Sequence, residues 1–335
     1  MVSRIPGVAG PAAFQRRLES GLSDLGVSIT YGLHDDALDA ILVIGGTRAL
    51  GSLARARRKG IRILHRLNGM NWIHKQRRTG IRHYVRSEFN NLLLRLIRDR
   101  IANHVIYQSV FAQSWWEKTH GPSQARKSVI YNGVPLEIFK PDPARQRPSD
   151  QIHLLMVEGN LSGGYEVGLQ MGVELANRLQ SKLSHAVELA VAGQIPQDLE
   201  EQFEKTSNVS IRWLGLVAPD KIPGLDQSAH ILYSGDPNPA CPNAVIEAIA
   251  CGLPVVAFAT GAIPEIITNN AGRAVEYGGD VWKLEQPDME ALTEAAVDIF
   301  SKQAQFRAGA RERAQEAFSL QSMARLYLQV LEGKA

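Results

Sequence analysis

The segment 241–258 constrains the fold of this chain more than any other part of the sequence. Pro242 suits the first turn of a helix, because the backbone N–H that proline lacks would have no partner there. Gly252 stands where a helix ends in a left-handed residue, and Pro254 stops the helix from continuing. The apolar run 255–258 fits a strand that is covered on both faces. The segment therefore predicts a helix that ends abruptly and leads into a buried strand.

Short apolar runs alternate with helical stretches along the sequence. Such alternation predicts parallel sheets with helices on both faces, which is an α/β fold. The expected strands are residues 27–31, 40–44, 61–67, 104–108, 128–131, 152–157, 187–192, 209–213, 230–233 and 254–258.

A break near the middle divides this pattern into two Rossmann-like halves. Residues 140–150 contain three prolines and no large apolar side chain, as expected for a linker between domains. A length of 335 residues also exceeds the usual size of one domain. Ligands in such sheets bind beyond the carboxyl ends of the strands, so two facing halves would create a cleft.

Charge is distributed unevenly behind the small net value of +3. Residues 1–140 contain 22 Lys and Arg against 9 Asp and Glu, whereas the remaining residues contain 15 against 25. A basic half suggests an anionic partner, which is a membrane surface, a phosphorylated acceptor or nucleic acid. Sequence-specific nucleic-acid binding is not expected, because zinc-ligand spacing, RNP-like aromatic residues and a helix-turn-helix pattern are all missing from the sequence.

Composition places the chain among ordinary globular proteins, with 44% hydrophobic and 21% charged residues. No apolar run reaches the ~18 residues of a membrane span, and residues 1–7 lack the apolar core of a signal peptide. Cys241 and Cys251 would bracket the predicted helix and are expected to be reduced and buried. These features predict a cytoplasmic protein.

The start of the helix after Pro242 is a candidate phosphate site, because helix N-termini present N–H groups and a partial positive charge. Glu247 lies four residues after Asn243 and three after Ala244, so the three share one face. A carboxylate at that position could accept hydrogen bonds from a ribose diol while the helix start holds a diphosphate.

At these residues, in the stretch 236–257 and the following Gly261-Ala-Ile-Pro-Glu-Ile, the chain resembles the GT-B glycosyltransferases, specifically the retaining family 4. The resemblance implies an α/β fold of GT-B architecture, with two Rossmann-like domains facing across a cleft. That family carries two glutamates separated by seven residues. Glu247 matches the second, which contacts the donor ribose. The first would fall at Pro239, and Asp236 is the nearest acid.

Other segments extend the resemblance over nearly the whole chain. Tyr131-Asn-Gly-Val-Pro resembles the end of the family's first domain, and Trp213-Leu-Gly, which includes Leu214, resembles its turn near the base. Gly10-Pro-Ala, before an expected helix at 14–25, resembles its first Gly-rich loop. We expect domains at 1–140 and 151–317, and a final segment 318–335 whose helix, about 320–331, packs back on the first domain.

Asn68 follows an expected strand at the position where the family often has a histidine that contacts the transferred sugar. Asparagine can hydrogen-bond a hydroxyl group but cannot titrate. Retaining transfer in this fold is thought to need no protein base, because the leaving diphosphate can take the acceptor proton. By the alternation of a strand, His65 points away from the face shared by Arg66 and Asn68 and is expected to be packed.

The second Gly-rich segment, 157–166, departs from the family, which places an arginine and a lysine there to neutralise the diphosphate. Asn160 takes the arginine position, and Gly164 or Tyr165 takes the lysine position. Three alternatives remain: an anion nest of backbone N–H groups, cations from the first half, or a weak or inactive enzyme. The candidate residues are Gly163 and Gly164 for the nest, Arg66 and Lys75 for the cations, and Gly159, Asn160 and Gly193 as further nucleotide contacts.

Residues 72–103 form a basic stretch whose second half has apolar residues at helical spacing. The arginines are Arg77, Arg78, Arg82, Arg86, Arg95, Arg98 and Arg100, and the apolar residues are Leu92, Leu93, Leu96, Ile97 and Ile101. One interpretation is a core helix with a solvated basic face. The other is a surface for anionic lipid, since such enzymes often act on lipid-linked acceptors.

Together these features favour a retaining glycosyltransferase that moves a hexose from a nucleotide-sugar, with UDP as the expected nucleotide and UDP-glucose as the candidate donor. The expected acceptor is a glycan or lipid-linked sugar in envelope or exopolysaccharide synthesis, at the inner membrane face. No Asp-x-Asp motif is present, so no metal or other cofactor is expected. The alternatives are a catalytically silent UDP-binding or scaffold protein, and a GT-B nucleotide-sugar epimerase.

Overall fold

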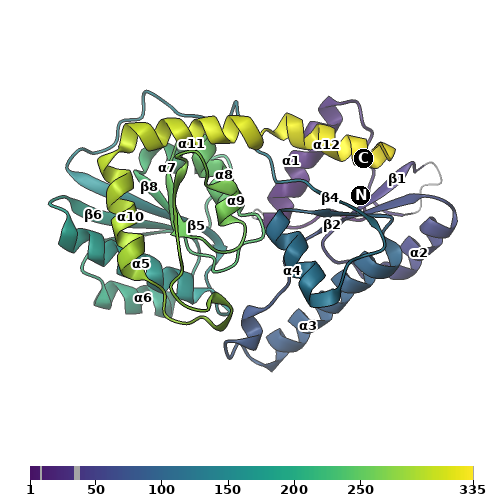
Figure 1. Cartoon of the computed structure of the whole chain (residues 1–335), viewed down its shortest axis with the longest axis horizontal. Coiled ribbons are helices and arrows are strands. Elements are labelled where there is room, and N and C mark those ends of the chain that lie inside the picture. Colours follow the sequence, from purple (N-terminus) through teal and green to yellow (C-terminus); the bar gives the residue numbers. More distant parts are fainter. Residues whose placement is uncertain (8–9, 34–37, 335) are drawn as a thin grey trace. The chain divides into compact units, whose positions relative to one another are not determined.

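The computed structural model describes residues 1–7, 10–33 and 38–334, and the chain divides into two compact units (Figure 1). The first unit comprises Met1–Lys75, Thr79–Gly133 and Ser319–Ala335. The second comprises Gln76–Arg78 and Val134–Phe318. Each unit has its own parallel sheet, so the predicted α/β class with two Rossmann-like parts is confirmed.

The sheet of the first unit contains four strands among the described residues, in the order β1-β2-β3-β4. All neighbouring pairs are parallel, so the four carboxyl ends lie at one edge of the sheet. The strands are β1 (Ala40–Ile44), β2 (Arg62–Leu67), β3 (His104–Tyr107) and β4 (Arg126–Val129). The helical segments are α1 (Gly10–Asp24), α2 (Leu50–Arg58), η1 (Ile73–Lys75), α3 (Ile81–Leu96), η2 (Ile97–Ile101), α4 (Val110–His120) and α12 (Leu320–Glu332).

The last helix, α12, packs against α1 within the first unit, as the yellow and purple ribbons of Figure 1 show. The Tyr327 ring lies 5.7 Å from the Phe14 ring, and both side chains are buried. The helices approach so closely that a Cβ at Gly21 would lie 2.8 Å from the Cβ of Ala324. Glycine at position 21 therefore allows the chain's final segment to dock on its first helix.

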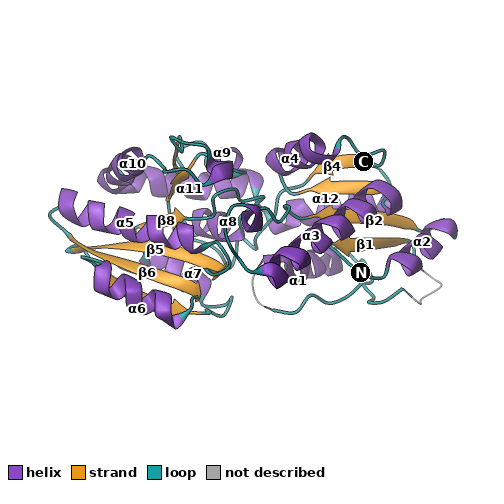
Figure 2. Cartoon of the chain, turned by 90° about the horizontal axis from the view of Figure 1, so that it is seen from below, coloured by secondary structure: helices purple, strands orange, loops and turns teal. Residues whose placement is uncertain are grey.

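The second unit has a six-stranded parallel sheet in the order β10-β9-β8-β5-β6-β7. Helices lie on both sides of its strands, shown purple and orange in Figure 2. The strands are β5 (Gln151–Asn160), β6 (Ala186–Gln194), β7 (Ser210–Gly215), β8 (Ile231–Ser234), β9 (Val255–Phe258) and β10 (Gly272–Val275). The helical segments are α5 (Glu166–Lys182), α6 (Gln197–Thr206), α7 (Ile222–Ser228), α8 (Asn243–Ala250), α9 (Ile263–Ile266), η3 (Val281–Lys283), α10 (Met289–Ser301) and α11 (Gln303–Ala317).

One predicted strand was wrong, and one strand of the structure was missed. Residues 27–31 form no strand, because their backbone bonds locally instead of joining the sheet: Val27 N–H donates to Leu22 O, and the Met1 ammonium donates to Thr30 O. β10 was missed because four residues that include Gly272 and Arg273 give no clear apolar pattern. The other nine expected strands overlap strands of the structure.

The boundary between the units falls between Gly133 and Val134, not in the segment 140–150. The reason is that residues 134–139, which precede this segment, already form hydrogen bonds within the second unit. Val134 N–H donates to Phe318 O, and Arg311 donates to Phe139 O at 2.8 Å. Arg147 then donates from Nε to Ala229 O at 2.6 Å, so the proline-rich segment is also fastened to the second unit.

The segment 241–258 folds as expected in most respects. Pro242 is the N-cap of α8 and not its first helical residue, Gly252 is left-handed with φ +69°, and β9 follows. Cys241 and Cys251 are free thiols and buried. None of the helices in the described part of the chain has the length and apolar character that a membrane crossing requires.

Candidate functional site

In the first unit, a buried arginine gathers polar side chains at the carboxyl ends of the strands. Arg66, the penultimate residue of β2, is 2% exposed. Its Nη1 donates to Asn68 Oδ1 at 2.5 Å, and its Nη2 donates to Gln108 Oε1 at 2.7 Å and to Asn132 Oδ1 at 2.9 Å. The guanidinium also lies 3.9 Å from the centre of the Phe14 ring. One cation thus orients three amides contributed by the ends of β2, β3 and β4.

Asn68 is fixed from several directions. Its backbone oxygen accepts from Trp116 Nε1 at 2.9 Å. A Cβ at Gly45, which follows β1 with φ +66°, would lie 2.8 Å from the Asn68 Nδ2 atom. Only glycine both adopts that backbone conformation easily and leaves room for the amide. The end of β1 therefore contributes to the shape around Asn68.

His65 is a packed histidine, as strand alternation predicts. It is fully buried, and its Nε2 lies 2.9 Å from Gly45 O. Burial, with the charges of Arg98 and Arg66 added, lowers the pKa of His65 to about 4 against the opposing effect of the Gly45 hydrogen bond. The ring is neutral at pH 7, so it donates this hydrogen bond and carries no charge into the site.

The other candidates in the first unit take different positions. Lys75 belongs to η1, where its exposed Nζ lies 3.2 Å from Glu88 Oε1. Gly10 is the first residue of α1, with φ +50°, so the helix starts four residues before the expected position. The structure thus brings Arg66 and Asn68 together and holds Lys75 by a separate ion pair.

Gln108, Asn132 and Gly45 were not predicted as members of this group. Each lies just beyond the carboxyl end of a strand, which is the signal that could have found it. Asn132 also lies in the Tyr131-Asn-Gly-Val-Pro segment. Its side chain is 3% exposed, so an asparagine there is placed for hydrogen bonding and not for solvation.

In the second unit, the order of the strands in the sheet indicates that a ligand site lies near β5 and β8. The chain runs from β5 outward to β6 and β7, then returns to the other side of β5 as β8. Ligands of open parallel sheets bind beyond the carboxyl ends of the strands where the order reverses. The residues after β5 and β8 are therefore the prime candidates, and they include the second Gly-rich segment and Asp236.

The Gly-rich turn after β5 does not present an open anion nest. Gly163 and Gly164 have φ +69° and +104°, as a nest or tight turn requires. However, Gly164 N–H donates to Glu166 Oε2 at 2.7 Å, so a carboxylate of the same chain already binds there. Asn160 is exposed, and its Oδ1 accepts from Ser162 Oγ at 2.8 Å. An incoming phosphate would have to displace the Glu166 carboxylate.

Gly193 and Leu214 have structural explanations. A Cβ at Gly193, the second-last residue of β6, would lie 2.7 Å from Glu158 O, so glycine permits the close approach of β6 to the end of β5. Leu214 lies in β7, which β6 separates from β5. Gly159 is part of β5 itself.

Two carboxyl groups at the reversal point have strongly shifted pKa values. Burial, together with the charge of Asp236 after β8, raises the pKa of Glu158 in β5 to about 8 against the opposing effect of a backbone hydrogen bond from Gly235. Burial also raises the pKa of Asp236 to about 6, although its Oδ1 accepts from Asn238 N–H at 3.1 Å. At pH 7 Glu158 is mostly protonated and Asp236 is mostly ionised. Two neighbouring acids with separated pKa values are a common feature of functional sites.

Asn238 adds a hydrogen-bond donor that finds no partner among the described residues. The residue is 5% exposed, and its Nδ2 is buried. A buried, unsatisfied N–H group is costly, and it is most easily explained by a ligand or ordered water that completes it. This asparagine lies within the stretch 236–257 that resembles the family, but no role was predicted for it.

Position 239 cannot supply the missing glutamate. Pro239 O accepts from Ala262 N–H at 2.8 Å, and a Cβ on Gly261 would lie 2.5 Å from Pro239 atoms. The backbone there is packed against the turn before α9. Pro239 is therefore a structural residue, and Asp236 is the acid nearest to it along the chain.

Asn243, Ala244 and Glu247 lie on α8, as predicted. Glu247 is 7% exposed. Behind it lies Asp226 of α7, which is 1% exposed; burial raises its pKa well above the usual value, and the Glu247 charge adds to this effect. The raised pKa favours the protonated form of Asp226 on α7, which lessens its repulsion of the Glu247 carboxylate on α8.

Comparison with known proteins finds similarity to glycosyltransferases. Residues 153–302 match the family model described as Glycosyl transferases group 1. One relative is a subunit of the phosphatidylinositol N-acetylglucosaminyltransferase of Arabidopsis thaliana, which is 29% identical over 178 residues, or 52% of this chain and 36% of that protein. The gpi3 subunit of the same enzyme in Schizosaccharomyces pombe is 28% identical over 151 residues, 44% of this chain and 32% of that protein. The chain thus matches about a third of the length of these curated relatives.

Solved structures resemble the whole chain. WaaG, a glycosyltransferase involved in lipopolysaccharide biosynthesis, has a TM-score of 0.72 at 16% identity, covering 99% of this chain and 98% of WaaG. The HepE protein of Anabaena, in complex with UDP and glucose, has a TM-score of 0.69 at 16% identity, with coverage of 99% and 98%. Sucrose-phosphate synthase of Thermosynechococcus elongatus has 0.69 at 16%, with 97% and 94%. The chain has the GT-B fold of these glycosyltransferase structures, and its residues 153–302 match the model of the Glycosyl transferases group 1 family.

Proposed function

We propose that this protein is a retaining glycosyltransferase that moves a hexose from a UDP-sugar to a glycan or lipid-linked acceptor. The observation that carries the proposal is the position of Glu247 on α8, in a group 1 domain whose strand order reverses between β5 and β8. A buried carboxylate near a helix start suits a ribose diol, and UDP is bound in the Anabaena protein of the same fold.

In this proposal, the polar groups after β5 and β8 replace the arginine and lysine that the family uses at the diphosphate. Asn238 offers a buried N–H group, and Glu158, protonated at pH 7, donates a hydrogen bond where an ionised carboxylate would repel. The N–H groups of the Gly163–Gly164 turn become available when Glu166 is displaced. These neutral donors stabilise the leaving group less than two cations would, so turnover is expected to be slow.

The exposed face of α3 supports an acceptor at a membrane. The sequence left two interpretations for residues 72–103: a core helix with a solvated basic face, or a surface for anionic lipid. Some apolar residues of this stretch fit the first interpretation and others fit the second. Leu93, Ile97 and Ile101 are buried, whereas five apolar residues at helical spacing are exposed by 37–82%. The exposed residues, here called the α3 stripe, are Ile81, Val85, Phe89, Leu92 and Leu96.

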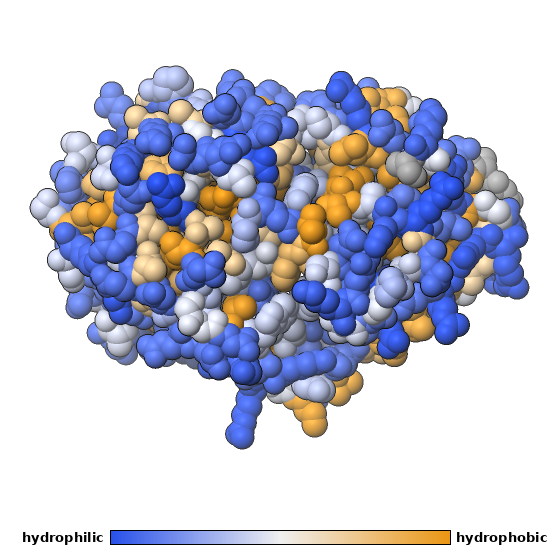
Figure 3. Space-filling view, viewed as in Figure 1, coloured by the Kyte–Doolittle hydropathy of each residue, from blue (hydrophilic) through white to orange (hydrophobic). Residues whose placement is uncertain are grey.

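Exposed arginines flank the α3 stripe, including Arg82, Arg86 and Arg95. Hydrophobic atoms protrude among hydrophilic ones at the lower edge of Figure 3, where Figure 1 places α3. A continuous apolar stripe with basic borders is the pattern of a helix that lies in the interface of an anionic bilayer. We propose that α3 attaches the protein peripherally to such a surface, where lipid-linked acceptors are found.

The alternative function is a catalytically silent UDP-binding or scaffold protein. It is favoured by the packing of Pro239 and by the Glu166 carboxylate at Gly164 N–H. Calorimetry with UDP and an assay for UDP-sugar hydrolysis separate the two. UDP binding without any transfer or hydrolysis would support the silent protein.

The decisive experiment incubates the protein with UDP-hexoses and short glycan or lipid-linked acceptors, and determines the anomeric configuration of the product by NMR. We expect the configuration of the donor to be retained. The Glu247→Gln variant should lose activity, and Glu201→Gln, which alters an exposed residue of α6, should not. An inverted product, or equal activity in both variants, would contradict the proposal.

A further inference from the structure

A pocket of about 370 Å³ lies in the second unit on the side opposite to the candidate nucleotide site. It is lined by Pro141, Gly252 and one face of α11. Gly252 precedes the amino end of β9, whereas the candidate nucleotide residues follow the carboxyl ends of β5 and β8. In a parallel sheet these ends lie at opposite edges, so the pocket is separate from the donor site.

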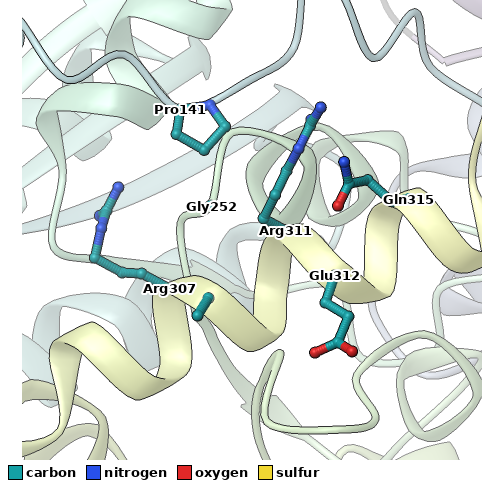
Figure 4. A pocket seen from close by; sticks show the side chains of 7 residues that line it. Pro141, Gly252, Arg307, Arg311, Glu312 and Gln315 are labelled. Carbon is teal, nitrogen blue, oxygen red and sulfur yellow. The ribbon is translucent and has the colours of Figure 1, made fainter.

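Two arginines one helical turn apart, Arg307 and Arg311, project from α11 into this region, and Figure 4 shows both guanidinium groups on the side of Pro141. Arg311 is fully engaged by the protein. It donates to Phe139 O at 2.8 Å, to Ala250 O at 2.7 Å and to Leu136 O at 3.2 Å. Arg311 therefore caps the carbonyl end of α8 and holds the segment that enters the second unit.

Arg307 is different, because its Nη1 is buried and has no hydrogen-bond partner among the described residues. Burial, together with the charge of Arg147, lowers the pKa of Arg307 to about 10. Arg147 itself is fastened to the carbonyl oxygens of Gln227 and Ala229. The two guanidinium groups thus lie near each other, and Nη1 of Arg307 donates to no acceptor in the described part of the chain.

The carboxylate in the pocket lining does not compensate this charge. Figure 4 shows Glu312 pointing to the opposite side of α11 from Arg307 and Arg311. The groups that shift the pKa of Arg307 are Arg147 and the Cys251 thiol, and they include no carboxylate. A partly buried cation without a counter-charge is costly, and an anion in the pocket would relieve that cost.

We propose that this pocket binds a phosphate-class oxyanion, either free or as the end group of a small phosphorylated metabolite, through Arg307. The occupant would lie between α11, the turn at Gly252 and the segment at Pro141. It would thereby link the segment around Pro141, near the start of the second unit, to α11, the last helix of that unit. The anion is thus a stabilising ligand, independent of the donor nucleotide.

Calorimetric titration of the full chain with inorganic phosphate, in a chloride buffer of constant ionic strength, tests this proposal. Arg307→Gln removes the cation and keeps a polar side chain, and Arg325→Gln removes an exposed arginine of α12 as the matched control. We expect phosphate affinity to fall about tenfold in Arg307→Gln, because one charge-assisted hydrogen bond is lost, and to be unchanged in Arg325→Gln.

A thermal-shift series on the wild-type chain keeps the test decisive even if Arg307→Gln folds poorly. Phosphate should raise the melting temperature above that in chloride at equal ionic strength. No difference between the two anions, or equal phosphate affinity in wild type and Arg307→Gln, would overturn the proposal. Glycerol 3-phosphate distinguishes the sources: tighter binding than inorganic phosphate indicates a metabolite, and equal binding indicates the free anion.

Discussion

The Nη1 group of Arg66 donates a 2.5 Å hydrogen bond to Oδ1 of Asn68, two residues further along the chain. A guanidinium that is buried in this way orients the amide and cannot move far toward a ligand. Arg66 is thus better placed to position Asn68 than to reach a diphosphate itself. This relationship changes what substitutions in the first unit should do.

Arg66→Met should destabilise the first unit by about 2–4 kcal/mol, because three amide oxygens lose a charged donor inside the protein. Urea unfolding followed by circular dichroism measures the change. If folded protein is obtained, turnover should fall more than UDP affinity, since Asn68 loses its orientation. A variant as stable as Arg325→Met would show that the buried network contributes little.

Glu247→Ala should weaken UDP binding by about 1.5–3 kcal/mol, because a charged acceptor for the ribose hydroxyls is lost. Calorimetry with UDP measures the effect, and circular dichroism checks that α8 remains folded. An unchanged dissociation constant would place the nucleotide elsewhere.

Asn238→Ala should lower UDP affinity by about 1–2 kcal/mol while leaving the unliganded protein stable, because the buried Nδ2 has no partner to lose among the described residues. The comparison requires calorimetry and a thermal melt on the same sample. A large drop in melting temperature with unchanged UDP affinity would assign Asn238 a purely structural role.

The contribution of Glu158 to stability should fall as the pH rises from about 4.5 to 8. The pKa of Glu158 is raised from 4.5 in the unfolded chain to about 8 in the folded protein, so folding favours the protonated form. This contribution is fully present below the unfolded pKa and is lost as the pH passes through the folded pKa. Asp236 adds a smaller loss up to about pH 6.

Glu158→Gln should therefore flatten the dependence of melting temperature on pH, and the variant should exceed the wild type at about pH 8.5, above the folded pKa. Glu201→Gln, at an exposed position, should keep the wild-type slope. Parallel slopes for Glu158→Gln and wild type would show that Glu158 has an ordinary pKa.

Val85→Asp should reduce binding to vesicles containing anionic lipid about tenfold, because Val85 lies in the middle of the α3 stripe and is 62% exposed. Co-sedimentation at low salt measures binding, and wild-type binding should weaken as salt rises. Ile138→Asp is the control, since Ile138 is 56% exposed in the second unit. Equal binding of all three proteins would remove α3 from the contact.

The sequence was most informative where local rules and tertiary packing agree. The helix from Asn243, the left-handed Gly252 and the strand after Pro254 follow from residue types that leave few conformations open. Neither the strand β10 nor the irregular structure of residues 27–31 could be predicted. Whether a short segment becomes a strand depends on whether tertiary packing brings it to the edge of a sheet. The sequence therefore predicted the fold class correctly but not the exact set of strands.

Residue types and their spacing were enough to establish two α/β halves and a helix face shared by Glu247 and Asn243, because strand and helix periods are local properties. Three-dimensional packing was needed to learn that Arg66 is buried against Asn132, that Glu166 binds Gly164 N–H, and that Glu158 titrates near pH 8. These facts depend on desolvation and on contacts that form only in the folded chain. Neither is encoded in the residue types of any one segment.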